Sequence, residues 1–110
     1  MIIEDLQNAT INISSSGDNE IIAAPGAGKY LAIDHINFLP TSAVTVTFYS
    51  GAAGTALSGP YPFDAKQATA LDNAMQAQKG VITCGDNKAF VINLGSAVQV
   101  GGFVRYRIVG

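Results

Sequence analysis

The clearest alternation of apolar and polar positions in the chain spans residues 44–49. Val44, Val46 and Phe48 occupy one parity, and hydroxyl-bearing residues occupy the other. This is the period of a β-strand with one buried face, and β-branched and aromatic residues suit such a pleated surface. The run ends in a small-residue segment with two glycines at 50–54, and a short apolar return then stops at a Gly-Pro pair. The pattern therefore predicts a hairpin at the centre of the chain.

Further alternating runs lie on both sides of this hairpin, separated by turns rich in glycine, serine, asparagine and aspartate. No segment has the strand-helix-strand rhythm of a parallel sheet, so we predict an all-β fold, an antiparallel jelly-roll-like β-sandwich of about eight short strands. The predicted strands are residues 10–14, 20–24, 29–39, 44–49, 55–58, 81–84, 88–94 and 103–109. The apolar side chains predicted to be buried between the two sheets are Val46, Phe48, Phe90, Ile92, Val104 and Ile108.

The longest predicted strand changes parity part-way along its length. Leu31 and Ile33 share one face, but the next two large apolar residues, Ile36 and Phe38, belong to the other. An extra residue at 34–35, a β-bulge, would return all four side chains to one face, because one inserted residue resets the alternation. The alternative is a regular strand buried on both faces. We favour the bulge.

Residues 65–79 interrupt the strand pattern with a run of good helix formers. Asp64 followed by Gln67 fits a capping pattern, and a glycine after the run can close a helix. Leu71 and Met75 lie four residues apart, as on one helix face, and we take both as candidate contacts with a partner. The apolar stripe is thin, so a short helix and a helical turn within a long loop both stay open.

The apolar residues at the start of the chain follow no regular period. We therefore divide the chain into an N-terminal arm, 1–9, and a single domain, 10–110. The arm either reaches a partner, by lying across it or by adding a strand to a sheet edge, or packs on its own sandwich as a first strand. Its candidate partner contacts are Met1, Ile2, Ile3 and Leu6.

Composition limits the classes of partner. Charged residues make up 13% of the 110 residues and apolar residues 48%, so we expect copies of the chain or another protein to bury part of the surface. A net charge of −2 argues against nucleic acid, and no apolar run approaches the length that spans a membrane. Glu4 and Asp5 stand where a secretory signal carries basic residues, so we expect synthesis in the cytoplasm without a signal peptide.

The distribution of reactive residues predicts no enzyme and no cofactor. His35 is the single histidine and Cys84 the single cysteine, and no segment around them or around a serine forms a nucleophile motif. One histidine and one cysteine are too few for a zinc site without several carboxylates, so we expect no metal. Asp18 and Asp86 lie in matching Gly-Asp-Asn segments, which we interpret as structural turns rather than calcium loops.

Two arginines mark the last predicted strand. Arg105 and Arg107 lie two residues apart, so they share one face of the strand. They either clamp acidic groups of a partner, because a guanidinium binds a carboxylate through two parallel hydrogen bonds, or they line a solvated face. We take both as candidate partner contacts.

Several turn and strand motifs, taken in order, resemble those of small β-sandwich proteins of tailed bacteriophage heads. That family has a Gly-Asp-Asn segment, a Gly-Lys turn and an Ala-Val-Thr-Val strand ending in Ser-Gly. A Leu-x-Gly-Pro segment, an Asn-Leu strand and a Val-Gly-Gly start to the last strand follow. The corresponding segments here are 17–19, 28–29, 43–51, 57–60, 93–94 and 100–102. Residues 65–78 depart from the family, which more often has a glycine-rich extended run there.

The resemblance implies a structural virion protein that decorates and stabilises a bacteriophage capsid by binding the outer surface of its coat lattice. The implied partners are the major capsid protein and further copies of this chain, with no nucleic acid and no membrane. The implied location is the outer surface of the capsid, after synthesis in the host bacterial cytoplasm. The alternative is a carbohydrate- or receptor-binding module of a phage tail or fibre, which an exposed Tyr49 or Tyr61 beside Asp or Asn would favour.

Overall fold

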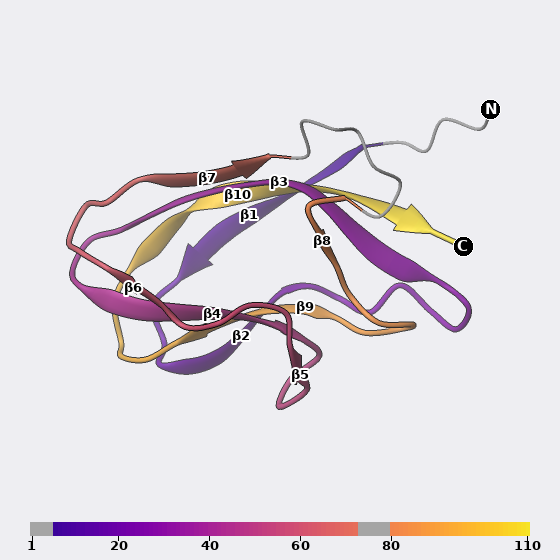
Figure 1. Cartoon of the computed structure of the whole chain (residues 1–110), viewed down its shortest axis with the longest axis horizontal. Coiled ribbons are helices and arrows are strands. Elements are labelled where there is room, and N and C mark those ends of the chain that lie inside the picture. The colour runs from indigo at the N-terminus through magenta and orange to yellow at the C-terminus, as the bar shows by residue number, and fades with distance from the viewer. Residues whose placement is uncertain (1–5, 73–79) are drawn as a thin grey trace.

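The computed structural model describes residues 6–72 and 80–110. Within them, ten strands form two antiparallel sheets that pack face to face (Figure 1). Sheet A has the order β1-β10-β3-β7, with β8 also paired to β3. Sheet B has the order β2-β9-β4-β5, with β6 also paired to β4. The strands are β1 (Gln7–Ile13), β2 (Gly17–Ile22), β3 (Tyr30–Pro40), β4 (Val44–Ser50), β5 (Thr55–Ala56), β6 (Tyr61–Phe63), β7 (Thr69–Asp72), β8 (Ile82–Thr83), β9 (Phe90–Leu94) and β10 (Val100–Val109).

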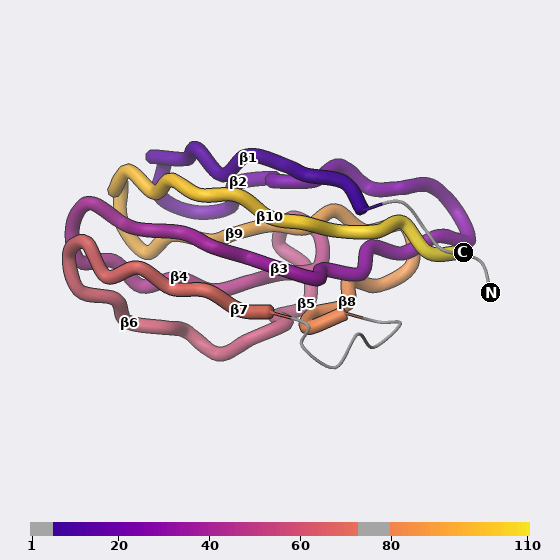
Figure 2. The backbone as a smooth tube through the Cα atoms, turned by 90° about the horizontal axis from the view of Figure 1, so that it is seen from above, coloured from indigo at the N-terminus to yellow at the C-terminus, as the bar shows by residue number. Residues whose placement is uncertain are grey.

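The strands pair in nested order, which is the arrangement of a jelly roll. β1 pairs with β10, β2 with β9, β3 with β8 and β4 with β6, all antiparallel. A chain paired in this way is one long hairpin rolled up, so alternate pairs fall into opposite sheets. The predicted all-β sandwich is confirmed. Viewed from above, β1 and β2 lie together along one long side of the sandwich (Figure 2).

The core lies between the two sheets and consists of the apolar parity of each strand. Phe48 is at its centre, with ring centroids 5.7 Å from Phe90 and 6.2 Å from Phe38. Ile108, also predicted to be buried, is only partly buried and packs against this core from β10. The other five predicted core residues are at most 1% exposed: Val46, Phe48, Phe90, Ile92 and Val104.

β3 contains the predicted bulge. Arg105 of β10 lies opposite His35, but the next residue, Tyr106, lies opposite Ile33, so Asp34 is the extra residue of β3. The alternation resets there, as expected for one inserted residue. The two apolar residues before the bulge and the two after it are all buried in the core: Leu31, Ile33, Ile36 and Phe38.

The helix or helical turn predicted within 65–79 is wrong for the described part of that segment. Thr69–Asp72 form β7, which pairs antiparallel with β3 and places Leu71 opposite Ile36. Pairing with the edge of β3 satisfies backbone N–H and C=O groups of β7. That gain outweighs a helix propensity of a few tenths of a kcal/mol per residue, roughly the spread among ordinary residues.

The capping pair forms one hydrogen bond of its predicted pattern, but it begins a turn and no helix follows within residues 65–72. The Oε1 atom of Gln67 accepts a hydrogen bond from the backbone N–H of Asp64 at 2.8 Å, and this bond closes the turn between β6 and β7. Residues 73–79, which include Met75, lie outside the described part. No helix in residues 6–72 and 80–110 is long and apolar enough to cross a membrane.

Candidate functional site

The outer face of sheet A carries exposed aromatic, aliphatic and cationic side chains close together. Val104 of β10 is fully buried, so its neighbours Phe103 and Arg105 point outward. The register of the sheet places Phe103 beside Asn37 and Arg105 beside His35, both on β3. These four residues therefore form one continuous outward surface, which we call the Phe103 surface.

Phe103 anchors this surface through aromatic and cation contacts. Its ring stacks on the His35 ring, with centroids 5.4 Å apart and planes inclined by 27°. The guanidinium carbon of Arg105 lies 5.9 Å from the Phe103 ring centroid, within cation–π range. His35 Nδ1 lies 3.2 Å from the Oδ1 atom of Asp72, at the β7 edge of the sheet. Phe103 is nevertheless 37% exposed, and Leu39, on the same face, is 39% exposed.

The two arginines of β10 lie on the predicted common face but differ in what they bind. Arg107 Nε donates to Asp34 Oδ2 at 2.6 Å, and its Nη2 donates to Asp34 Oδ1 at 3.0 Å. This pair is largely buried, with side chains 17% and 15% exposed. The bulge brings the Asp34 carboxylate to the arginine, so Arg107 serves the fold. Arg105 is the exposed arginine of the two.

The remaining predicted contact residues have separate locations. Leu6 immediately precedes β1 and is 58% exposed. Leu71 is only partly buried but packs against the core from β7. Met1, Ile2, Ile3 and Met75 lie outside the described residues. β1 begins at Gln7, inside the segment predicted to be an arm, and the Tyr106 hydroxyl lies 3.2 Å from Gln7 Oε1.

His35 and Cys84 do not come together. Cys84 is 2% exposed and belongs to the core between the sheets, whereas His35 stacks on Phe103 on the outer face of sheet A. Burial raises the pKa of the Cys84 thiol to about 12, so the thiol stays protonated at neutral pH. In the described ranges, no group of three or more His, Cys, Asp or Glu residues is arranged to hold a metal ion.

Asp18 lies on the outer face of sheet B and joins three parts of it. Its Oδ2 accepts the backbone N–H of Ala53, in the β4–β5 turn, at 2.7 Å, and its Oδ1 accepts Asn93 Nδ2, on β9, at 2.8 Å. These bonds lower the pKa of the carboxyl, the Asn93 bond more than the Ala53 bond. The predicted turn at this residue is wrong, because Asp18 pairs with Asn93 within β2 and β9.

Replacing Asp18 by asparagine is expected to lower the free energy of unfolding at pH 7 by about 1 kcal/mol or less, since the carboxylate is exposed. The folded-state pKa lies below the ordinary value near 3.8, so this stabilisation is present above pH 4 and is lost as pH falls through the folded pKa. Urea unfolding of both proteins at pH 7 and pH 3 measures it. A difference that is equal at both pH values would contradict the role of the charge.

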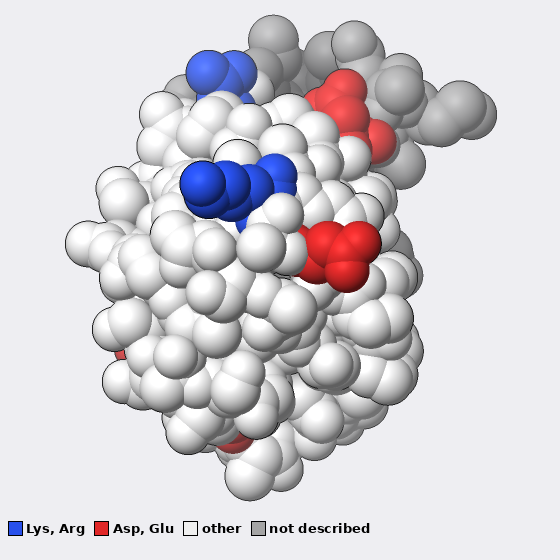
Figure 3. Space-filling view, turned by 90° about the vertical axis from the view of Figure 1, so that its left-hand side faces the viewer, with Lys and Arg blue, Asp and Glu red and all other residues white. Residues whose placement is uncertain are grey.

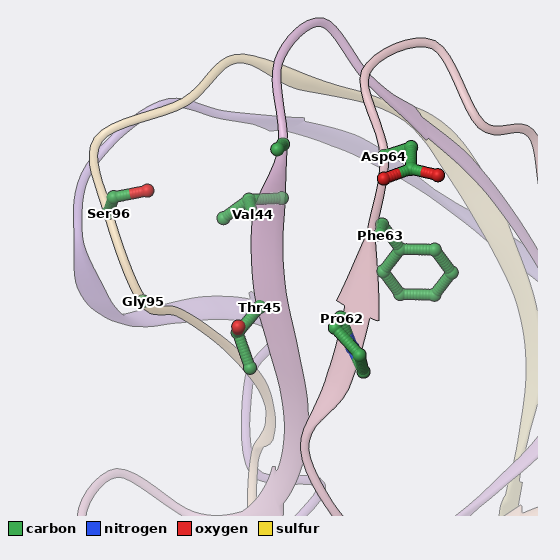
Figure 4. A pocket seen from close by; sticks show the side chains of 8 residues that line it. Val44, Thr45, Pro62, Phe63, Asp64, Gly95 and Ser96 are labelled. Atoms are coloured by element: carbon green, nitrogen blue, oxygen red, sulfur yellow. The ribbon is translucent and has the colours of Figure 1, made fainter.

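One end of the sandwich carries few charged side chains, and those of Asp64 and Lys66 are exposed in its β6–β7 turn. It carries the turns between β3 and β4, β6 and β7, and β9 and β10, and Figure 3 views it end-on. A shallow depression of about 400 Å³ lies there, between β4, the end of β6 and the β9–β10 turn (Figure 4). Asp64 is its single ionisable lining residue, so it offers no acid–base pair. The lining residues are Ala43, Val44, Thr45, Pro62, Phe63, Asp64, Gly95 and Ser96.

Sequence reasoning missed Phe103 and the pairing of His35 with Asp72. Phe103 has the same parity as Arg105 in the last strand, so its outward direction was available from the alternation. Asp72 was hidden within the segment predicted to be helical. Asp72 approaches His35 only because β7 pairs with β3, and the two residues are 37 positions apart in the chain.

Comparisons with known proteins identify no relative of this chain. The chain matches no protein-family model, and neither the curated proteins nor the solved structures contain a significant match to it.

Proposed function

We propose that this protein is a structural virion protein that decorates and stabilises a bacteriophage capsid by binding the outer surface of the coat lattice. The observation that carries the proposal is the Phe103 surface together with Leu39. An exposed aromatic and an exposed aliphatic residue lie on one sheet face, beside an exposed arginine. Apolar groups ringed by polar ones, with aromatic residues and arginine enriched, are typical of protein–protein contact surfaces.

Two further features support a binding role over a catalytic one. His35 and Cys84 are separated by sheet A, so they cannot act together as base and nucleophile. The order of sequence motifs from 17–19 to 100–102 resembles proteins of phage heads. The proposed partners are the major capsid protein and further copies of this chain. The proposed location is the capsid exterior, reached after synthesis in the host bacterial cytoplasm.

The proposed contacts with the coat are the exposed residues of sheet A and the start of the chain. In this proposal Arg105 binds a carboxylate of a coat subunit, and Phe103 buries its ring against that subunit. The apolar residues Met1, Ile2 and Ile3 stay proposed contacts. A truncation that tests them removes residues 1–5, because removing Gln7 as well would shorten β1 and disturb the fold.

The proposal is tested by cosedimentation of the purified protein with undecorated heads of the virus that encodes it. We expect saturable binding in fixed proportion to the coat subunits. We expect Arg105→Glu to weaken the binding at least about tenfold, because it places a like charge opposite the acidic partner group. Lys66→Glu, the same charge reversal in the exposed β6–β7 turn, is the matched control and should bind as the parent does. Absence of binding to heads would overturn the proposal.

A carbohydrate- or receptor-binding module of a tail or fibre is the second candidate. Tyr61 is 42% exposed, and the next residues of β6 line the depression beside Asp64. Tyr61 itself does not line the depression, and its ring centroid lies 6.1 Å from those of both Phe48 and Phe63. Glycan binding that is lost in Tyr61→Ala, with binding to tails in place of heads, would favour this candidate.

A further inference from the structure

β1 is the edge strand of sheet A, and no other strand of the described chain pairs with its outer side. Figure 2 shows it along one long side of the sandwich, with β10 on its inner side. Alternate residues of an antiparallel edge strand point their N–H and C=O groups away from the sheet. Every second residue along the seven of β1 therefore presents unpaired backbone groups, and this row of groups is a template for adding a strand.

The other exposed edges of the described sandwich each carry a feature that hinders strand addition. β5 and β8 have two residues each, and β6 has three residues with a proline in the middle. β7 has four residues. β2 has two carboxylates, Asp18 and Glu20, and an irregular register between Glu20 and Ile22. Short strands, charges, proline and bulges are the means by which sheets avoid edge-to-edge pairing.

β1 has none of these features. Its sequence, Gln-Asn-Ala-Thr-Ile-Asn-Ile, contains no charge and no proline. Its register with β10 is unbroken from Gln7 opposite Tyr106 to Ile13 opposite Val100. Two copies of one chain carry the same charges, so a charged edge repels its own copy, whereas this uncharged edge does not.

We propose that β1 pairs antiparallel with β1 of a second copy, about a two-fold axis at Thr10, so that sheet A continues from one subunit into the next. The outward residues of β1 read Asn8, Thr10, Asn12, which is the same in both directions. An antiparallel pair centred on Thr10 therefore sets Thr10 opposite Thr10 and Asn8 opposite Asn12. Threonine pairs and amide pairs in such positions form cross-strand hydrogen bonds.

The inward residues of β1 fit the same register. Ala9 would lie opposite Ile11 of the second copy, and Gln7 opposite Ile13. Within their own subunit, Ile11 is buried in the core and Ala9 and Ile13 are partly buried. The pairing therefore continues the apolar face of sheet A into the second copy, and no charged residue of β1 lies on that face. The two-fold arrangement satisfies both edges at once, which closes the assembly as a dimer and prevents continued growth.

The inference requires no capsid, so it is tested on the free, full-length protein and its outcome is independent of the proposed function. Sedimentation equilibrium of the parent protein should show a dimer at a concentration of about 100 µM, a hundredfold above a micromolar Kd. A parent protein that is monomeric at this concentration would overturn the proposal. So would a dimer that persists undiminished when a charge is placed at position 10.

The discriminating variants are Thr10→Lys and Thr10→Glu, which place like charges opposite each other at the two-fold axis. Each should weaken dimerisation at least about tenfold while keeping the parent circular dichroism and melting temperature, since Thr10 is exposed. A mixture of the two variants should restore the dimer, because lysine then faces glutamate. Failure of the mixture to recover would place the interface elsewhere.

Asn37→Lys is the matched control. Asn37 is exposed on the same outer face and in the same row as Thr10, with Phe103 between them. It lies two strands away from the edge, about 10 Å at the usual spacing of strands. The added charge is the same, so the dimer should form as in the parent. Equal weakening by Asn37→Lys and Thr10→Lys would assign association to the outer face of the sheet and overturn the edge pairing.

Discussion

Replacing Phe48 by alanine is expected to lower the free energy of unfolding by about 3–5 kcal/mol. Phe48 is 1% exposed, and its ring contacts Phe90, Phe38 and Tyr61 with centroid distances of 5.7, 6.2 and 6.1 Å. Removing the ring leaves a cavity between the two sheets that these aromatic neighbours cannot fill without distorting both. A domain of this size is stable by about 5–15 kcal/mol, so the loss is a large part of the total.

Urea unfolding monitored by circular dichroism measures the effect. Phe103→Ala removes the same side chain from the outer face of sheet A, where it is 37% exposed, and serves as the control. We expect that control to cost roughly 1 kcal/mol or less, because surface substitutions leave no cavity. Similar losses in the two variants would mean that Phe48 does not hold the sheets together.

Replacing Gly102 by alanine is expected to destabilise the fold by roughly 3 kcal/mol, at the upper end of the cost of overpacking. A Cβ atom built on Gly102 would lie 2.7 Å from the Cα atom of Phe38 and would clash with the carbonyl oxygen of Asn37. These are backbone atoms of the neighbouring β3, so the clash cannot be relieved by turning a side chain. β10 and β3 must therefore move apart at this point, although their register is the longest between any two strands described.

Gly101→Ala is the matched control for this substitution. A Cβ atom on Gly101 would meet nothing within 4 Å, although the two glycines are neighbours in the same strand. The change should lie within about 0.5 kcal/mol of the parent. Thermal unfolding of the two variants and the parent compares them directly. A stable Gly102→Ala protein beside a destabilised Gly101→Ala protein would reverse the assigned faces of β10.

Much of the fold could be predicted from the alternation because each strand has one buried face. Val46, Phe48 and Val104 are in the core since they hold the apolar parity of their strands. The bulge in β3 was also predictable, because a break in parity between Ile33 and Ile36 has few structural causes. The helix prediction failed at 69–72, where Leu71 faces the core and Asp72 faces outward with the period of a strand.

The candidate site was less predictable because its members meet only across strands. Arg105 and Arg107 have the same parity and residue type, so nothing local separates the exposed arginine from the one paired with Asp34. The difference comes from the bulge residue Asp34, whose carboxylate binds Arg107. Its approach to Arg107 depends on the register of β3 and β10, two strands that are far apart in the chain. The pairing of His35 with Asp72 depends on β7 in the same way.

The sequence by itself determined the fold class, the buried parity of the strands and the position of the bulge. These are local properties, because side chains alternate along a strand whatever its partners are. The tertiary structure alone decided the nested pairing order, the edge position of β1 and the burial of Arg107. Each of these depends on which strands lie side by side, and backbone hydrogen bonds between strands are nearly independent of residue type. Strand order is therefore set by how the whole chain buries its apolar faces together.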